Sequence, residues 1–250
     1  MARFIRMLKK KIFRIPQNSN LKEFDDVRQL FFDKNGIEIG GPSNFFKADG
    51  YLPIYSIAKT LDGVNYSTST VWTGVIRQDE GFVIDGRRFG RQFIADAVDL
   101  SSIKDKYDFL LSCNNIEHIA NPMKAVEQWL SVLKDDGILL IVAPRKESNF
   151  DHYRSIVAFD HVLNDYNTNV SEDDSTHLRE ILLLHDLKMD PPAGTFAQFV
   201  DRSLKNHENR CFHHHVFDLA VLRAILTYFH TAILKEIQLN SDYLIIGRKN

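Results

Sequence analysis

The chain has 250 residues, of which 44% are hydrophobic and 26% charged, so it can form one sizeable globular domain with room for an insertion. A formal net charge of −2 gives no general attraction for nucleic acid, and we expect no nucleic-acid partner. The two cysteines, Cys113 and Cys211, exclude a disulfide framework and a cysteine-based zinc site. They are typical of a reducing compartment, so we expect a cytoplasmic protein.

Residues 1–15 mix basic side chains with hydrophobic ones, and Phe4, Leu8, Ile12 and Ile15 fall on one helical face. The lysines interrupt what would otherwise be the hydrophobic core of a secretory signal. We therefore predict a basic amphipathic arm over residues 1–20. Two interpretations stay open: a helix lying on the anionic inner face of a membrane, or an arm that packs on the domain or stays disordered.

The remaining residues, 21–250, predict one α/β domain. After a polar break, residues 21–32 have helical spacing. Strands are expected at residues 37–41, 59–66, 92–97, 107–113 and 138–143, and a helix at residues 122–133. Strands that alternate with helices in this way indicate a parallel sheet covered on both faces.

This alternation breaks over residues 145–212, a stretch rich in His, Asp and Asn with short helical pieces. Because it is too long for an ordinary loop, we interpret it as a substrate-shaping insertion or lid. The alternation returns with a helix over residues 218–229, which Asp218 can cap, and strands at 232–239 and 243–247. Their short connection favours a hairpin, so the last strand is expected to run antiparallel.

The segment Gly36-Ile37-Glu38-Ile39-Gly40-Gly41-Pro42-Ser43 has the pattern of a buried strand that ends in a nucleotide-binding turn. Two glycines allow a sharp turn and the close approach of a ligand. Pro42 and Ser43 favour the first turn of a helix, whose free N–H groups suit a polar or anionic ligand. A tight turn without a ligand is the alternative.

Two acidic residues follow at positions where such folds hold a nucleotide. Asp62 comes after the turn at the spacing of an acid that binds ribose hydroxyls. Asp96 follows the expected third strand, where a carboxylate can accept from an adenine amino group. The segment Ser112-Cys113-Asn114-Asn115-Ile116-Glu117-His118-Ile119 then follows the next buried strand.

This ordered set resembles the class I S-adenosylmethionine-dependent methyltransferases, over residues 36–144 and again over 213–249. The matching pieces are Glu38-Ile39-Gly40-Gly41, Asp62, Ala95-Asp96-Ala97, and residues 115–119 with 133–139. The resemblance implies a Rossmann-like, doubly wound sheet of seven strands with the last antiparallel and a helical insertion after strand five. It also implies S-adenosylmethionine as cofactor, bound by Glu38, Gly40, Gly41, Asp62, Asp96, Ala97 and Asn115. The usual G-x-G-x-G is reduced here to Gly40-Gly41-Pro42, and Asp62 lies beyond a longer connection than is usual.

Methyl transfer is an in-line displacement that depends on positioning, and an alcohol acceptor also needs a group that takes its proton. His118, at the end of the fourth strand, suits this role, although it can also be a structural histidine that holds the loop. Asp151 and His152 follow the fifth strand. We predict all three as catalytic residues.

Most of the ten histidines lie in or beside the insertion. They favour a general base, a polar shell for a sugar, or a divalent metal site. No two of them have a recognised ligand spacing, and His213, His214 and His215 cannot all face one point on a strand. We therefore predict no metal site, and we expect Arg154, His161, His213 and His215 to bind the substrate, with Arg154 suited to clamp a phosphate or carboxylate.

The function that these features favour is O-methylation of a polar small molecule or a saccharide, because polar insertions suit hydroxylated substrates. The basic arm adds a cell-surface or lipid-linked glycan as a hypothesis. Segments 150–154 and 213–217 look like those of bacterial methyltransferases. Two alternatives stay open: a cofactor-binding partner protein without catalysis, and a nicotinamide-dependent oxidoreductase, which usually has a full G-x-G-x-x-G.

Overall fold

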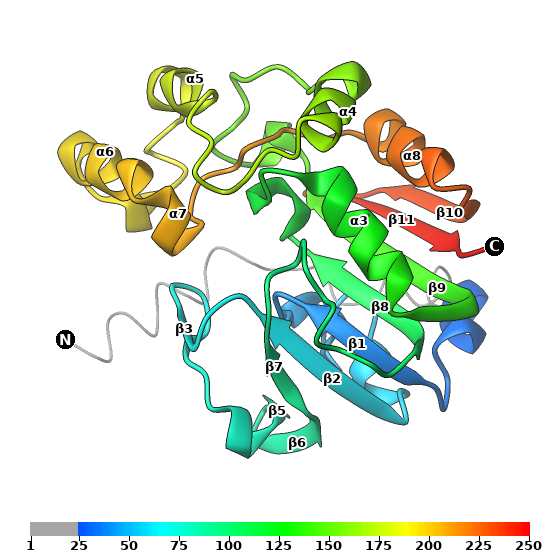
Figure 1. Cartoon of the computed structure of the whole chain (residues 1–250). Coiled ribbons are helices and arrows are strands. Elements are labelled where there is room, and N and C mark those ends of the chain that lie inside the picture. The colour runs from blue at the N-terminus through cyan, green and yellow to red at the C-terminus, as the bar shows by residue number, and fades with distance from the viewer. Residues whose placement is uncertain (1–24) are drawn as a thin grey trace.

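The computed structural model describes residues 25–250, which are built around a seven-stranded sheet (Figure 1). The strand order is β10-β11-β9-β8-β1-β2-β7. The strands are β1 (Asn35–Ile39), β2 (Thr60–Asn65), β7 (Gln92–Ile94), β8 (Tyr107–Cys113), β9 (Leu133–Pro144), β10 (Ala232–Gln238) and β11 (Asp242–Arg248). Only β11 is antiparallel to its neighbours, β9 and β10, so the predicted doubly wound sheet with an antiparallel last strand is confirmed.

The central strands are buried on both faces, as their continuous hydrophobic runs predict. On one face, Ile37, Leu110 and Leu139 pack in a core that includes residues of the helices α3 (Pro122–Ser131) and α8 (Leu219–Tyr228). On the other face, Phe109 and Leu140 pack with residues of the long β1–β2 connection. That connection holds only the 3-10 helices η2 (Asn44–Phe46) and η3 (Ile54–Ser56).

The segment after the glycine turn differs from the predicted helix. Ser43 is the N-cap of η2, where its side chain accepts from the backbone N–H of Phe45. The expected α-helix after the glycine turn is therefore a three-residue 3-10 helix. The predicted arm over residues 1–20 lies outside the described residues, and so does part of the helix predicted over 21–32, where the structure shows η1 (Arg28–Leu30).

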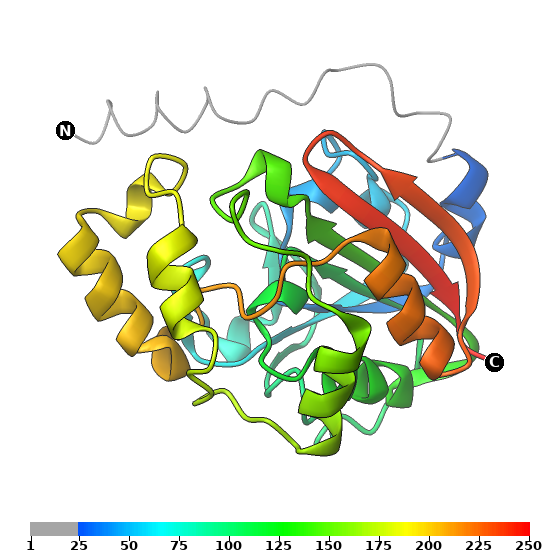
Figure 2. The same cartoon turned by 90° about the horizontal axis from the view of Figure 1, so that it is seen from above.

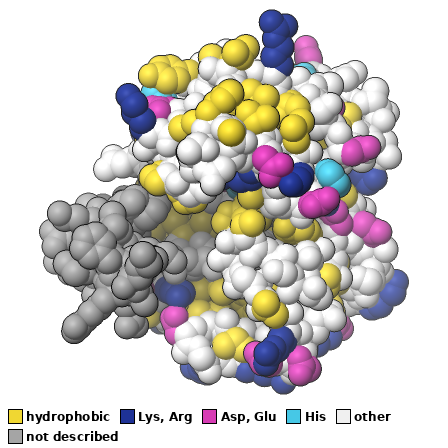
Figure 3. Space-filling view, turned by 90° about the vertical axis from the view of Figure 1, so that its left-hand side faces the viewer, with side chains coloured by type: hydrophobic (Ala, Val, Ile, Leu, Met, Phe, Trp, Pro, Cys, Tyr) yellow, Lys and Arg dark blue, Asp and Glu magenta, His cyan; other side chains and the backbone are white. Residues whose placement is uncertain are grey.

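The insertion over residues 145–212 is helical. Its part after residue 176 lies at the end of the molecule away from β10 and β11, whereas its helix over residues 159–167 packs beside α8 (Figure 2). Its elements are η6 (Lys146–Ser148), α4 (Phe159–Asn167), α5 (Leu178–Leu184), η7 (Pro191–Ala193), α6 (Phe196–Leu204) and α7 (Asn206–Asn209). Ile181, Phe199 and Phe212 form a small core of their own. Figure 3 shows hydrophobic side chains gathered on one face of the molecule. Leu183 of α5 and Phe196 of α6 are among the exposed hydrophobic side chains of the chain.

Two small hairpins between β2 and β7 were not expected. They are β3 (Ser69–Thr70) with β4 (Gly74–Val75), and β5 (Phe82–Ile84) with β6 (Arg87–Gly90), joined through η4 (Gln78–Glu80). Asp85 and Gly86, both at positive φ, form the two-residue turn of the second hairpin. An Asp-Gly pair is a strong hairpin signal. Within residues 25–250, no helix combines the length and the hydrophobicity that a membrane crossing requires.

Candidate functional site

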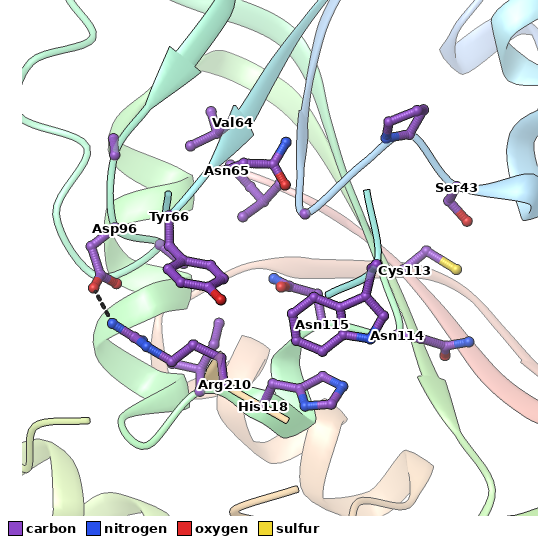
Figure 4. A pocket seen from close by; sticks show the side chains of 17 residues that line it. Ser43, Val64, Asn65, Tyr66, Asp96, Cys113, Asn114, Asn115, His118 and Arg210 are labelled. Carbon is purple, nitrogen blue, oxygen red and sulfur yellow. Dashed lines mark hydrogen bonds and ion pairs between the residues drawn. The ribbon is translucent and has the colours of Figure 1, made fainter. Parts of the chain in front are cut away.

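A pocket opens where β1, β2, β7 and β8 end at the same edge of the sheet (Figure 4). Its lining includes Gly40, Asn65, Asp96, Asn115, His118 and Arg210. Ligands of open α/β sheets bind at the carboxyl ends of the strands, and the strand order explains why segments far apart in the sequence meet here. We call this the strand-end pocket.

The glycine turn forms one wall of the strand-end pocket. Gly40 has φ +79°, and a Cβ at this position would lie 2.8 Å from Oδ1 of Asn115. A Cβ on Gly41 would lie 2.3 Å from the carboxyl carbon of Glu38. Both glycines are therefore needed. Gly40 has a backbone conformation that favours glycine and leaves room for Asn115, and Gly41 leaves room for Glu38.

Glu38 lies beneath this turn and is fully buried. Its carboxyl group accepts from the backbone N–H of Ser43 at 3.1 Å and from the hydroxyl of Tyr55 at 2.6 Å. Burial raises the pKa of Glu38 to about 8. The resemblance implied cofactor binding by Glu38, but Glu38 is not among the residues that line the pocket, so its contacts fit a role in orienting the turn.

Asp62 lies within β2, outside the strand-end pocket. Its carboxylate accepts from the backbone N–H and the guanidinium of Arg91, both at 2.6 Å, and from the hydroxyl of Tyr107 at 2.7 Å. The structure thus does not bring Asp62 to the predicted ribose position. The pocket residues at the end of β2 are instead Asn65, whose amide donates to the carbonyl of Gly41 at 3.1 Å, and Tyr66.

Asp96 and Ala97 line the strand-end pocket after β7, as expected for the adenine position. Oδ1 of Asp96 accepts from the N–H of Val98 at 3.2 Å, and Oδ2 pairs with Arg210 at 2.9 Å (Figure 4). Arg210 belongs to the insertion and also pairs with Glu172 at 2.9 Å. Arg210 could not be predicted as a pocket residue, because nothing in its local sequence links it to Asp96.

An acid–histidine cluster lies beside the pocket and consists of Glu117, His118, Asp151, Arg154 and His213. His118 lines the pocket, and its Nδ1 is 3.2 Å from the carbonyl of Phe212. Oε1 of Glu117 is 4.0 Å from Nε2 of both His118 and His213. Nδ1 of His213 is hydrogen-bonded to Asp151, whose other oxygen accepts from Arg154 at 3.0 Å.

Glu117 is the unusual member of this cluster. It is 1% exposed, and neither carboxylate oxygen has a hydrogen-bond partner among the described residues. Such a group is costly to bury, so its presence calls for an explanation. Sequence analysis quoted Glu117 within its motif but assigned it no role.

The charges in the acid–histidine cluster follow from burial and pairing. Burial, with the nearby charge of His213, lowers the pKa of His118 well below its usual value, whereas burial raises the pKa of Glu117 to about 7. Burial alone would lower the pKa of His213, but the charge of Asp151 outweighs it and raises that pKa. Burial would raise the pKa of Asp151, and His213 with Arg154 lowers it to about 2.

This pattern defines what the cluster can do. His118 is neutral at neutral pH, and a proton on Nδ1, donated to the Phe212 carbonyl, leaves Nε2 as an acceptor. Of the predicted catalytic residues, the structure therefore brings together His118 and Asp151. Predicted substrate residues Arg154 and His213 belong to the same cluster, where both are buried against Asp151.

Three other predicted residues lie elsewhere. Nε2 of His152 is 3.1 Å from Asp186, away from Asp151. His161 contacts His177, and His215 contacts Asp165. His213, His214 and His215 point to three different sets of neighbours, as the sequence predicted for adjacent residues.

Trp72 is a further pocket residue, and it was given no role from the sequence. It follows β3 in the first unexpected hairpin and is 55% exposed. Its ring lies edge-on to His118, with 4.9 Å between ring centroids. An exposed aromatic ring beside a proton acceptor is suited to contact a bound ligand.

Residues 63–141, about a third of the chain, match the model of the family described as "Methyltransferase domain". No curated protein matches the sequence. Among solved structures, the chain is similar to a candidate S-adenosylmethionine-dependent methyltransferase from Listeria monocytogenes, with 14% identity, a TM-score of 0.50, and coverage of 92% of this chain and 98% of that one.

Two further solved structures are similar over almost their full length. The N-methyltransferase NodS from Bradyrhizobium japonicum WM9 has 12% identity, a TM-score of 0.48 and coverage of 94% and 99%. The magnesium protoporphyrin IX methyltransferase from Synechocystis PCC 6803 has 11% identity, a TM-score of 0.45 and coverage of 100% and 95%. At these identities the likeness concerns the fold alone.

The chain thus has the class I methyltransferase fold, and the matched residues include β7, β8 and the 115–119 segment at the strand-end pocket. The fold and the family match together indicate S-adenosylmethionine as the cofactor.

Proposed function

We propose that the protein transfers the methyl group of S-adenosylmethionine to an oxygen atom of a polar small molecule, with saccharides as the favoured class. The observation that carries this proposal is the position of His118, a neutral imidazole in the wall of the strand-end pocket. An alcohol is a poor nucleophile until a neighbouring group takes its proton. A neutral histidine next to the cofactor site is suited to do so.

Several features of the pocket fit the cofactor. The absence of a Cβ at Gly40 leaves room in the pocket wall. The amide nitrogen of Asn115 is buried without a partner among the described residues, and the carboxylate of Asp96 keeps lone pairs free beyond its two contacts. We assign the cofactor contacts to Gly40, Asp96, Ala97 and Asn115, and the ribose side to Asn65 in place of Asp62. Gly41, which packs against Glu38, shapes the turn.

The cofactor would supply an electrophilic methyl group on a sulfonium, and the chain would supply positioning and proton transfer. Nε2 of His118 accepts the proton of the substrate hydroxyl. Glu117, which has a pKa of about 7, lies close enough to stabilise the resulting imidazolium. Asp151 and Arg154 hold His213 against the same pair, so we regard them as positioning residues.

The insertion over residues 145–212 acts in this proposal as the lid that shapes the acceptor site. Arg210 brings it to the cofactor pocket through Asp96. Hydroxylated acceptors fit the side chains found here, because histidine, asparagine and carboxylate groups offer both donors and acceptors.

Calorimetric titration with S-adenosylmethionine, S-adenosylhomocysteine and NAD tests the cofactor. We expect micromolar binding of both sulfur nucleotides and none of NAD. Transfer of a labelled methyl group to a panel of sugars, amines and phenols then tests the acceptor, with His118→Asn as the inactive variant and the exposed His207→Asn as its control. Transfer to amines but not to hydroxyl groups would refute O-methylation, and the absence of nucleotide binding would refute the whole proposal.

A further inference from the structure

A second group of histidines lies in and directly after the insertion, outside the strand-end pocket. It consists of His161 in α4, His177 at the N-cap of α5, and His215 in the segment that precedes α8. The three come from distant parts of the sequence, so no ligand spacing could reveal them. We call them the histidine triad.

The triad converges on a small volume. Nε2 of His161 is 3.0 Å from Nε2 of His177, and one nitrogen of each ring lies within 4.8 Å of the others. Zinc–nitrogen bonds of 2.0–2.1 Å place neighbouring ligand nitrogens roughly 3.0–3.4 Å apart, depending on geometry. The His161–His177 separation already has this value.

Carboxylates surround the triad as they do in known metal sites. Oδ2 of Asp165 is 3.0 Å from Nε2 of His215 and 3.4 Å from Nε2 of His161. Oε2 of Glu180 is 3.7 Å from Nδ1 of His177. Metal-binding histidines usually place their second nitrogen beside a carboxylate, which fixes the ring, and Nδ1 of His177 lies beside Glu180 in this way. Asp165 lies instead at Nε2 of His161, the nitrogen that faces His177, so it can itself be a ligand.

A further observation points to a ligand. His215 is 2% exposed, and its Nδ1 has no hydrogen-bond partner among the described residues, although a buried ring nitrogen usually has one.

We propose that His161, His177 and His215 bind one divalent transition-metal ion, with zinc as the favoured ion. Imidazole ligands suit Zn²⁺, Ni²⁺ and Cu²⁺ over Mg²⁺ or Ca²⁺. The fourth position is taken by Asp165 or by water, since the side chain of His161 is 41% exposed. The ion ties α4, α5 and the 213–215 segment together, and that segment also carries His213 of the acid–histidine cluster.

This proposal does not depend on the methyltransferase reaction, and its test uses metal binding alone. The full-length protein is stripped with EDTA and titrated with Co²⁺, whose visible absorption reports nitrogen ligands, and then with Zn²⁺. We expect one equivalent to bind. With Zn²⁺ at about 100 times its Kd, Tm should rise by roughly 5–10 °C, and EDTA should reverse the rise.

His161→Ala and His161→Asn are the test variants, because this partly exposed side chain can be changed without opening the core. Both should fold, with Tm in EDTA unchanged, and should bind Co²⁺ at least 100-fold more weakly. His207→Ala, an exposed histidine of α7, should bind as the original protein does.

Two results would overturn the proposal. The first is no stoichiometric Co²⁺ or Zn²⁺ binding, which would make the 3.0 Å contact an ordinary N–H···N hydrogen bond. The second is binding that survives both His161 variants but is lost in Glu117→Gln, which would place the ion at Glu117, His118 and His213, the other described group with ligand atoms close together.

Discussion

Replacing Gly40 by alanine tests the glycine turn as the cofactor wall. Gly40 has φ +79°, and its new Cβ would lie 2.8 Å from Oδ1 of Asn115. The left-handed backbone costs an L-residue about 1–2 kcal/mol. The contact with Asn115 is relieved only by moving that side chain, which faces the same pocket.

Gly86→Ala is the matched control. Gly86 has φ +80°, and a Cβ there would have no heavy atom within 4 Å. Both variants should therefore lose about 1–2 kcal/mol of unfolding free energy in urea, through the same backbone strain. Only Gly40→Ala should also lose affinity for S-adenosylhomocysteine, by at least about tenfold, which corresponds to roughly 1.4 kcal/mol.

The comparison separates folding from binding. Calorimetric titration of both variants with S-adenosylhomocysteine gives the affinities, and urea unfolding gives the stabilities. Two outcomes would refute the assignment of this turn to the cofactor. One is a nucleotide affinity of Gly40→Ala that equals that of the original protein, and the other is an equal loss of affinity in Gly40→Ala and Gly86→Ala.

Four more variants test single residues. Asp62→Asn should lower the unfolding free energy by roughly 2–3 kcal/mol, because Arg91 and Tyr107 lose a charged acceptor, and should leave nucleotide affinity intact. Asp96→Asn should weaken nucleotide affinity. If titrations showed weaker nucleotide binding in Asp62→Asn and unchanged binding in Asp96→Asn, Asp62 would belong to the site. The pKa of Glu38 is about 8 in the folded protein and 4.5 in the unfolded chain. Its favourable contribution to the unfolding free energy is therefore complete below pH 4.5 and is lost as the pH rises through 8. Between pH 4.5 and 9, the unfolding free energy measured in urea should fall by roughly 3–5 kcal/mol less in Glu38→Gln than in the original protein. An equal fall in both proteins would contradict the raised pKa of Glu38. His118→Asn should lower kcat by about 100-fold or more with nucleotide affinity kept, and full turnover in a methyl-transfer assay would remove His118 from the mechanism.

The sheet could be predicted because its signals are local. Each central strand is a hydrophobic run such as Phe109-Leu110-Leu111, bounded by polar residues. The hairpins between β2 and β7 were missed because their strands have two to four residues, too few for a clear alternation. The Asp85-Gly86 turn was the available signal for one of them.

The site was predictable only in part, because sequence spacing does not fix where an acid lies along a strand. Asp62 has the right distance from the glycine turn, but it falls three residues before β2 ends at Asn65. The connection between β1 and β2 has 20 residues, and its length does not show which residue of β2 lies at the pocket edge. Glu117 and Arg210 were missed for another reason: each acquires its role from residues that only the fold brings close.

The run His213-His214-His215 shows how one extended segment can serve several sites. His213 meets Asp151, His214 meets Asn206, and His215 meets Asp165. Arg154 donates to the backbone carbonyls of His213 and His214 at 2.8 and 3.0 Å, and also to Asp151. One buried guanidinium therefore fixes the segment that links the acid–histidine cluster to the histidine triad. The two sites therefore share one backbone segment, and Arg154 holds it at His213 and His214.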